Sequence, residues 1–172
     1  MIYYTSDLHL CHENIINLCE RPYSTVDEMN NDIIEKWNRK VKNGDTVYII
    51  GDMFFKQKDS RYVSQTLLKL NGEKILVTGN HDKFLKVLEN PYRYFKKITD
   101  YAKIQDQGRQ VILFHYPIEE WDGFFRGSYH LYGHVHNSTS NQLKLIKNRY
   151  NVGVDVNGFE PRTLDELIAM KK

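Results

Sequence analysis

Three short apolar segments mark the first half of the chain, and segments with helical spacing lie between them. Residues 2–6, 46–50 and 74–78 are rich in β-branched and aromatic side chains, which predicts strands. The segments 46–50 and 74–78 are continuously apolar, a pattern typical of strands that are buried on both faces. The first half therefore predicts a sheet whose strands alternate with covering helices.

Helices are predicted from apolar spacing together with start and stop signals. Thr25 followed by Glu28 is a capping box, which places the start of a helix there. The apolar residues after it recur at helical spacing, namely Val26, Met29, Ile33 and Trp37. An Asn-Gly stop signal at residues 43–44 should end this helix. Further helical segments are expected at 13–19, 63–70 and 83–88.

The second half of the chain is richer in strands. A hairpin is predicted from strands at 101–105 and 110–114 with a turn at 106–109, and further strands are expected at 129–132, 143–146 and 150–154. Thr163 and Glu166 form a second capping box, which opens a last helix. The order is thus β-α-β-α-β-α, then mostly antiparallel strands, then a helix. This order predicts an α/β protein in which two sheets pack together with helices outside.

Composition narrows the class of protein. The 172 residues suit one domain, residues 1–172, and 13% aromatic residues exclude a disordered chain. No apolar run approaches the ~18 residues of a membrane span, and we see no secretion signal, so we expect a cytoplasmic protein without a membrane partner. Two cysteines, Cys11 and Cys19, are expected to be free thiols. The net charge of +2 does not by itself indicate nucleic acid, and nothing fixes the oligomeric state.

Polar residues follow five of the predicted strands. These are Asp7 and His9, then Asp52, then Asn80-His81-Asp82, then His115, and finally His134 and His136. In open α/β sheets ligands bind beyond the carboxyl ends of strands, so these side chains should meet in one site. Residues two apart point to one face of an extended chain, so each of the pairs Asp7/His9 and His134/His136 can offer two ligands to one side.

The number of candidate ligands indicates two metal ions. Seven is too many for one tetrahedral zinc, and the set is Asp7, His9, Asp52, Asn80, His115, His134 and His136. Two dications ~4 Å apart need a shared anion, and Asp52 is the candidate bridge, with a bridging hydroxide as nucleophile. Two such ions, two carboxylates and a hydroxide leave a positive site that favours phosphate. Nitrogen and oxygen ligands suit manganese, our first choice, or iron, zinc, nickel or cobalt.

The ordered motifs resemble those of the calcineurin-like metallophosphoesterase family. The segments DLHLCHENII and NVGVDVNGFEPRTLDEL resemble those of its small stand-alone bacterial and phage members. The resemblance implies a four-layer α/β/β/α sandwich of two mixed sheets flanked by helices. It implies a first metal held by Asp7, His9, Asp52 and His136, and a second held by Asp52, Asn80, His115 and His134. It further implies that His81 protonates the leaving oxygen, or at least hydrogen-bonds the phosphoryl group, and that Asp82 orients or tunes His81.

Departures from the family pattern shape the expected substrate. The second motif continues as Met53-Phe54-Phe55 and lacks the second Asp and the Arg of the protein-phosphatase branch, and Cys11 stands where small members often have Gly. We therefore expect a phosphodiesterase acting on cyclic nucleotides or short nucleic-acid fragments, with nucleic acid as substrate only. The alternatives are a phosphomonoesterase on nucleotides or small metabolites, a nuclease, which would need a basic track, and a non-catalytic scaffold, which should have lost His81.

Several other residues have two open interpretations. His12 either reaches substrate phosphate or packs on the short helix after it. The loop 121–127 either packs at the edge of the sandwich or forms a lid in which Arg126 contacts phosphate. Asp155 either supports a ligand histidine or serves a turn, and His130 is expected to be structural.

Overall fold

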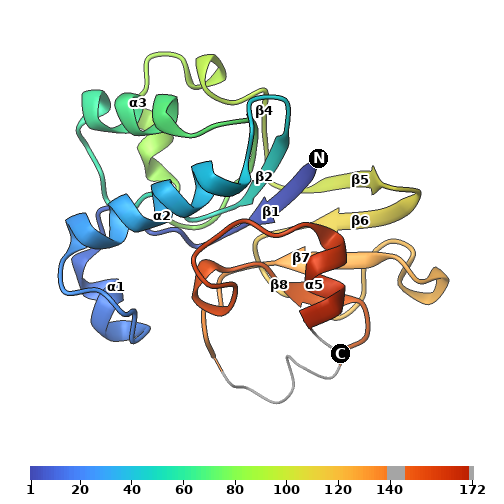
Figure 1. Ribbon diagram of the computed structural model, residues 1–172. Coiled ribbons are helices and arrows are strands. Elements are labelled where there is room, and N and C mark those ends of the chain that lie inside the picture. The colour runs from blue at the N-terminus through green and yellow to red at the C-terminus, as the bar shows by residue number, and fades with distance from the viewer. Residues whose placement is uncertain (139–145, 171–172) are drawn as a thin grey trace.

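The computed structural model describes residues 1–138 and 146–170, and it contains two four-stranded sheets (Figure 1). The first sheet has the order β1-β2-β3-β4 and all its pairs are parallel. Its strands are β1 Ile2–Thr5, β2 Thr46–Ile50, β3 Glu73–Val77 and β4 Lys97–Thr99. The second sheet has the order β5-β6-β7-β8. Its strands are β5 Ala102–Asp106, β6 Arg109–Leu113, β7 Tyr129–Tyr132 and β8 Arg149–Asn151.

The second sheet is mixed, and its last two pairs correct the expectation of mostly antiparallel strands. β5 and β6 form the predicted antiparallel hairpin, whereas β6 pairs with β7 and β7 with β8 in parallel. The connections 114–128 and 133–148 are long enough for the crossovers that parallel pairing requires. Sequence analysis missed the three-residue β4, and the strand expected at 143–146 lies, apart from its last residue, outside the described residues.

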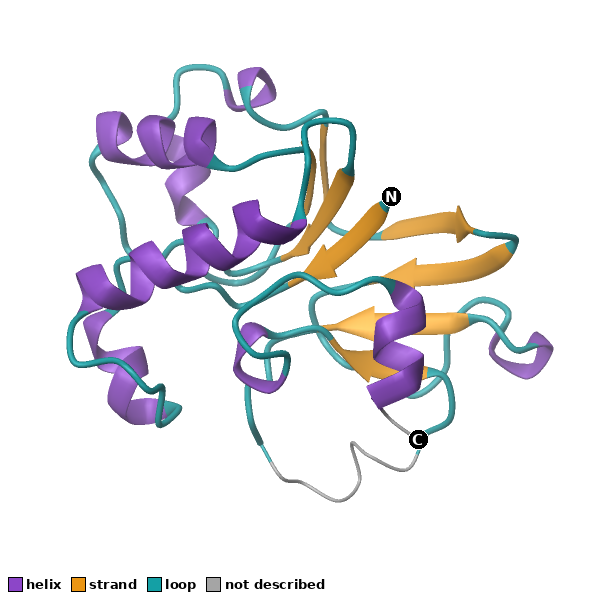
Figure 2. Cartoon of the chain, in the orientation of Figure 1, coloured by secondary structure: helices purple, strands orange, loops and turns teal. Residues whose placement is uncertain are grey.

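Helices lie on the outer sides of the sheets (Figure 2), which confirms the α/β class with two sheets flanked by helices. The expectation of two mixed sheets holds only for the second, because the described pairs of the first are all parallel. The α-helices are α1 Glu13–Leu18, α2 Val26–Lys40, α3 Ser60–Lys69 and α5 Leu164–Met170, and the 3₁₀ turns are η1 Lys83–Val87, η2 Pro91–Arg93, η3 Phe124–Arg126 and η4 Val154–Val156. Thr25 caps α2 by accepting a hydrogen bond from the Glu28 amide. α2 ends before the predicted Asn-Gly signal, because Val41 is already extended and the Asp45 carboxylate accepts from the Lys42 amide. None of the described helices is long and apolar enough to cross a bilayer.

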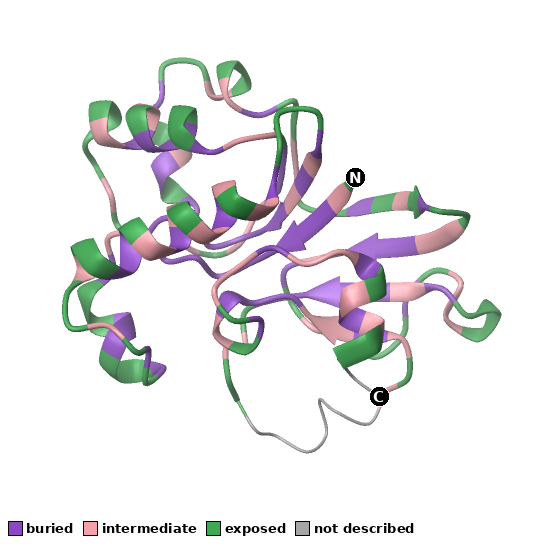
Figure 3. Ribbon diagram, viewed as in Figure 1, coloured by how far each residue is buried: buried purple, intermediate pink, exposed green. Residues whose placement is uncertain are grey.

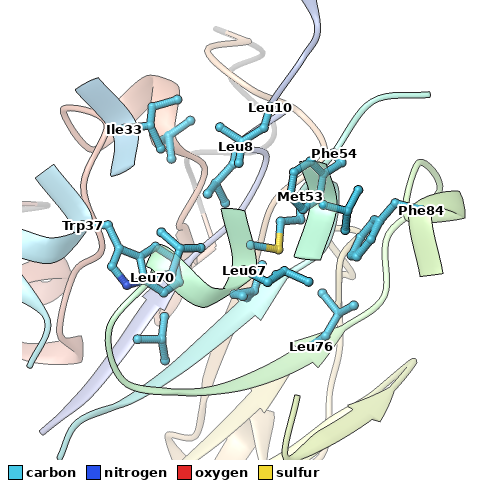
Figure 4. Close-up of a cluster of buried hydrophobic side chains, with 14 of the residues drawn as sticks. Leu8, Leu10, Ile33, Trp37, Met53, Phe54, Leu67, Leu70, Leu76 and Phe84 are labelled. Atoms are coloured by element: carbon cyan, nitrogen blue, oxygen red, sulfur yellow. The ribbon is translucent and has the colours of Figure 1, made fainter. Parts of the chain in front are cut away.

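Two apolar cores hold the layers together, and buried residues line the inner faces of the elements (Figure 3). The larger core packs α2 and α3 against the first sheet around Leu8, Trp37, Met53 and Leu67 (Figure 4). The second core lies between the sheets and includes Tyr4, Ile50, Val111 and Leu131. Burial of the strands on both faces makes them rigid supports for the loops at their carboxyl ends.

Candidate metal centre

The loops that follow β1 and β2 run side by side and bring two predicted ligand motifs together. The amide of Asp7 donates to the carbonyl of Gly51, and the amide of His9 donates to the carbonyl of Asp52, both at 3.0 Å. A third bond joins the Leu10 amide to the Met53 carbonyl. The backbone itself therefore places Asp7, His9 and Asp52 beside one another.

The loop after β3 is fastened to the same place by Asp82. Its buried carboxylate accepts hydrogen bonds from the amides of Gly79 at 2.7 Å, Met53 at 2.9 Å and Asp52 at 3.0 Å. Burial raises the pKa of Asp82 to about 6, although the amides oppose that shift. The described hydrogen bonds of Asp82 go to these backbone groups, so it contacts the backbone that leads to His81 rather than the His81 ring. Asp82 instead ties two ligand-bearing loops together.

The second sheet contributes its ligands through contacts with the first. Nδ1 of His115 lies 2.8 Å from the carbonyl oxygen of Ile50, which leaves Nε2 facing Asn80 Oδ1 at 3.1 Å. The amide of His134 donates to both carboxylate oxygens of Asp7, at 2.9 and 3.1 Å. The carboxyl ends of strands from both sheets therefore meet in one place.

All seven predicted ligands come together there, and we call this set the candidate metal centre. Potential ligand atoms of Asp7, His9 and His136 lie within 4.8 Å of one another. Those of Asp52, His115 and His134 form a second group with the same spacing. Asn80 adjoins the second group, because its Oδ1 lies 3.2 Å from Nδ1 of His134.

One structural feature of the centre, a buried ring nitrogen without a partner in the described part of the chain, shows that it fits divalent metal ions. Nε2 of His9 is buried and has no hydrogen-bond partner among the described residues. It lies 3.5 Å from Asp52 Oδ2, and a buried ring nitrogen without a partner carries a cost in free energy. The surrounding donors are imidazole nitrogens, carboxylates and an amide oxygen, which suit first-row divalent ions.

The candidate ligands are rich in left-handed backbone, since they supply five of the eleven non-glycine residues that the structure describes with positive φ. Five of the seven have positive φ angles, namely Asp7 (55°), His9 (49°), Asp52 (58°), His134 (70°) and His136 (50°). Such left-handed conformations are unfavourable for residues other than glycine and cluster at functional sites. The expectation that these pairs share a face of extended chain is therefore wrong, because the chain turns sharply at each ligand.

Glycines provide the space that the side chains of the centre occupy. A Cβ on Gly133 would lie 1.9 Å from Ser6 Oγ and 2.3 Å from Asp7 Oδ2. A Cβ on Gly79 would lie 2.3 Å from Asp52 Oδ1. Any larger residue at either position would displace a carboxylate of the centre.

Burial and mutual contact move the pKa values of the ligands in opposite directions. Burial raises the pKa of Asp7 to about 6 and lowers that of His9 to about 3. Burial also opposes the charge of His136, but its hydrogen bonds to Asp155 and Cys19 and the charges of Asp7 and Asp155 together outweigh this and raise the pKa to about 10. Protons and metal ions therefore compete for the same atoms, and metal binding should release protons.

Arg21 contacts the backbone of the candidate metal centre, and sequence reasoning missed it. It is buried, and its guanidinium donates to the carboxylate of Asp155 and to the carbonyls of Asp7 and Leu8. Asp155 in turn lies 2.8 Å from Nδ1 of His136, which favours its interpretation as the support of a ligand histidine. The free thiol of Cys19 adjoins this pair, with its sulfur within 4.8 Å of ligand atoms of His136 and Asp155.

His12 and Phe55 border the centre on one side. The His12 ring stacks on Phe55 with centroids 3.5 Å apart, and its Nδ1 lies 3.3 Å from Nδ1 of His9. Burial lowers the pKa of His12 to about 4. His81 completes this border, with its ring 5.0 Å from Phe55 and 5.5 Å from His9. His12 thus both packs on an aromatic ring and supports a candidate ligand.

The structure does not bring Arg126 to the centre. Arg126 precedes β7, whereas the ligands His134 and His136 follow it, so the strand separates them. Its guanidinium is exposed and pairs with Asp122, and Trp121 of the same loop is buried. The structure therefore places Arg126 away from the centre, and the loop 121–127 packs at the amino end of β7, which favours the packing interpretation over the lid. His130 is buried among backbone groups, as expected for a structural residue.

Comparison with known proteins identifies the family of this chain. Residues 1–157 match the calcineurin-like phosphoesterase family. The chain therefore belongs to the calcineurin-like phosphoesterase family, and it is a metal-dependent phosphoesterase, a hydrolase.

Similar proteins span almost the whole chain. An uncharacterised protein of Methanocaldococcus jannaschii, MJ1445, is 32% identical over 98% of this chain and 90% of its own length. The gene 66 protein of Mycobacterium phage L5 is 24% identical over 91% of this chain and 87% of its own. The crystal structure of AQ665 from Aquifex aeolicus, a protein of unknown function, is 29% identical with a TM-score of 0.78, covering 99% of this chain and 98% of that one. The resemblance thus extends to small proteins of similar length.

Proposed function

We propose that this phosphoesterase uses two divalent ions, with manganese as first choice, to hydrolyse phosphodiesters of cyclic nucleotides or short nucleic-acid fragments. The observation that carries the proposal is the position of the Asp52 carboxylate. Its Oδ2 lies 3.5 Å from Nε2 of His9 and 3.4 Å from Nε2 of His115. One carboxylate oxygen thus faces a nitrogen in each ligand group, which is the relation that two neighbouring ions sharing an anion require.

Each ligand has a definite place in this proposal. Asp7, His9, Asp52 and His136 would hold the first ion, and Asp52, Asn80, His115 and His134 the second. When bound, the ions supply a hydroxide nucleophile and neutralise charge on the phosphoryl oxygens. The protein keeps the ligand atoms in place through the left-handed backbone and through hydrogen bonds that backbone amides donate to Asp7 and Asp82.

His81 is the proposed general acid. Its amide donates to Asp52 Oδ1 at 2.8 Å, which fixes its backbone against the shared carboxylate. The ring lies at the border of the centre beside Phe55, where it can donate a proton to the leaving oxygen. Asp82 would act on the backbone, because its hydrogen bond from the Gly79 amide secures the loop that carries His81.

The charge around the centre favours a diester over a monoester. A phosphomonoester dianion gains more from an additional guanidinium than a singly charged diester does. Arg21 lies at the site, but its guanidinium is committed to Asp155 and two backbone carbonyls. Met53 and Phe54, which stand in the second motif, are buried in the apolar core.

The test compares hydrolysis of bis-p-nitrophenyl phosphate, a diester, with that of p-nitrophenyl phosphate, a monoester. Both are assayed with metal-stripped protein and after addition of Mn²⁺, Ni²⁺, Zn²⁺ or Mg²⁺. We expect metal-dependent diester cleavage that falls at least about a hundredfold in His81→Ala, the loss of a general acid, without loss of bound metal. Lys83→Ala, an exposed change in the same loop, is the matched control and should keep the wild-type rate.

Three outcomes would contradict the proposal or one of its assigned roles. A preference for the monoester would identify a phosphomonoesterase of nucleotides or small metabolites. Hydrolysis that survives intact in His81→Ala would remove His81 from the reaction. If the metal-loaded protein cleaves neither ester, the phosphodiesterase proposal fails.

A further inference from the structure

An exposed aromatic ring stands directly beside the candidate metal centre. The ring centroid of Tyr116 lies 4.6 Å from that of His134 and 5.1 Å from that of His115. Tyr116 is 37% exposed although it follows a fully buried ligand residue. The centre is therefore bordered on this side by a large ring that solvent can reach.

Two further rings extend from Tyr116 away from the centre. The ring of Phe114 lies 5.6 Å from Tyr116, and the ring of Tyr101 lies 6.4 Å from Phe114. The hairpin register brings the last two together, because Ala102 pairs with Leu113 and the next residues out are Tyr101 and Phe114. Tyr101 is 43% exposed and Phe114 is partly exposed. We call these three residues the aromatic row.

Backbone hydrogen bonds hold the aromatic row in place. The carbonyl of Tyr116 lies 3.2 Å from Nε2 of the buried His130, and the amide of Phe114 donates to the Leu131 carbonyl at 3.3 Å. The hydroxyl of Thr99 donates to the carbonyl of Tyr101. The row thus lies at the end of the β5–β6 hairpin, in the segments next to Ala102 and Leu113, and the second of these leads directly to His115.

We propose that the aromatic row is a stacking subsite for the bases of a short single-stranded nucleic acid whose phosphodiester lies at the candidate metal centre. This inference rests on the proposed phosphodiesterase function and narrows its substrate class. Successive aromatic rings bind successive bases by stacking, which tolerates any sequence because every base has a π face. A cyclic mononucleotide has one base and would engage Tyr116 alone, whereas three rings in a row match a chain of several nucleotides.

A conservative variant can separate base stacking by the Tyr116 ring from the contact that the Tyr116 hydroxyl makes with Asn80. The hydroxyl lies 3.4 Å from Oδ1 of Asn80, a candidate ligand, so loss of the whole side chain also removes this contact. Tyr116→Phe removes the hydroxyl and keeps the ring. A stacking role predicts that Tyr116→Phe resembles the wild type and that Tyr116→Ala does not.

The experiment uses two matched oligonucleotides. One is tetrathymidylate, and the other has the same backbone with tetrahydrofuran abasic units in place of the nucleosides. The measured quantity is the ratio of kcat/KM for the first to that for the second, with Mn²⁺ present. We expect the wild type to prefer the base-containing chain by about tenfold or more, and Tyr116→Ala and Phe114→Ala each to lower the ratio by about tenfold. Tyr92→Ala, which removes an exposed tyrosine from η2, should leave the ratio unchanged.

A binding measurement gives a second readout that does not depend on turnover. The dissociation constant of fluorescein-labelled tetrathymidylate is measured by anisotropy with Mn²⁺ present, in a His81→Ala background that cleaves slowly, and it should rise about tenfold when either alanine substitution is added. Equal ratios and equal dissociation constants in wild type and variants would overturn the inference. Metal-dependent hydrolysis of bis-p-nitrophenyl phosphate without cleavage of either oligonucleotide would overturn it and leave the phosphodiesterase proposal standing. Failure to cleave any of the three diesters would instead contradict the proposed function itself.

Discussion

The guanidinium of Arg21 donates two hydrogen bonds to the carboxylate of Asp155, at 2.7 and 3.1 Å, although 134 positions separate the two residues. The same guanidinium donates to the carbonyls of Asp7 at 2.8 Å and Leu8 at 2.9 Å. Asp155 also holds Nδ1 of His136 at 2.8 Å. One buried ion pair thus connects the loop after the first strand with a ligand that follows the seventh, and it supports both from behind.

Arg21→Lys should lower the free energy of unfolding of the metal-free protein by roughly 1–3 kcal/mol, because an ammonium cannot reproduce the planar fork and leaves buried acceptors unsatisfied. Urea unfolding followed by circular dichroism measures this change. Arg39→Lys is the matched control, since the Arg39 side chain is exposed and its contact with Glu160 is 3.6 Å long. That variant should stay within about 0.5 kcal/mol of wild type. Equal effects of the two substitutions would contradict the assigned role of Arg21.

Asp155→Asn should weaken Mn²⁺ binding by about 10–100-fold, because a carboxylate behind a ligating imidazole fixes its orientation and raises its basicity. Isothermal titration calorimetry with Mn²⁺ measures the affinity. Asp165→Asn is the control, because that carboxylate lies on the surface at the start of α5 and pairs with Arg109. An unchanged Mn²⁺ affinity in Asp155→Asn would show that His136 needs no such support.

Tyr4→Phe should lower the free energy of unfolding by roughly 1–3 kcal/mol, the usual cost of leaving a buried polar group without its partner. The hydroxyl of Tyr4 donates to Asp106 Oδ2 at 2.9 Å in the core between the sheets, and both residues are buried. Urea unfolding compares this variant with Tyr92→Phe, whose ring is exposed and whose change should be small. A loss as small as that of the control would contradict the importance of this buried bond.

The buried His130 should make the protein less stable as the pH falls from about 6.5 to about 4. Burial lowers its pKa in the folded state to about 4, whereas the unfolded chain binds a proton near pH ~6.5. The contribution of neutral His130 to the free energy of unfolding is therefore complete above pH ~6.5. It is lost as the pH falls through the folded-state pKa, at up to about 1.4 kcal/mol per pH unit. His130→Gln, or His130→Asn if the first does not fold, should show a shallower loss in urea unfolding between these pH values. Parallel curves for wild type and variant would refute this assignment.

Much of the fold was predictable because local signals and apolar patterns agree. The strand at residues 46–50 and the strand at 129–132 have the predicted bounds. The hairpin was predictable because Gly108 lies in its two-residue turn, Gln107-Gly108, where the backbone needs positive φ and glycine adopts it without steric cost. Strand direction in the second sheet was not visible, because short apolar segments do not record whether a crossover or a hairpin joins them.

The gathering of the candidate ligands was also predictable, since polar residues at the carboxyl ends of parallel strands necessarily converge. The left-handed backbone at Asp7 and His134 was not, because strained conformations at residues other than glycine leave no compositional signal. Arg21 was missed because its partners are backbone carbonyls and a residue far along the chain. Arg126 was misplaced because proximity in sequence to ligand motifs does not show at which end of a strand a residue lies.

The most direct test of the two-metal proposal is the number of metal ions bound per folded chain, measured by mass spectrometry after equilibration with Mn²⁺ and gel filtration. Wild-type protein should retain two equivalents, and Asp52→Asn should lose metal together with diester hydrolysis, because the shared carboxylate faces both ligand groups. Asp45→Asn is the control, because the Asp45 carboxylate accepts hydrogen bonds from the Met1 ammonium and the Lys42 amide and is not one of the candidate ligands. This variant should retain both equivalents. Two equivalents and full activity in Asp52→Asn would contradict the shared site, and a wild-type protein active with a single equivalent would contradict the pair of ions.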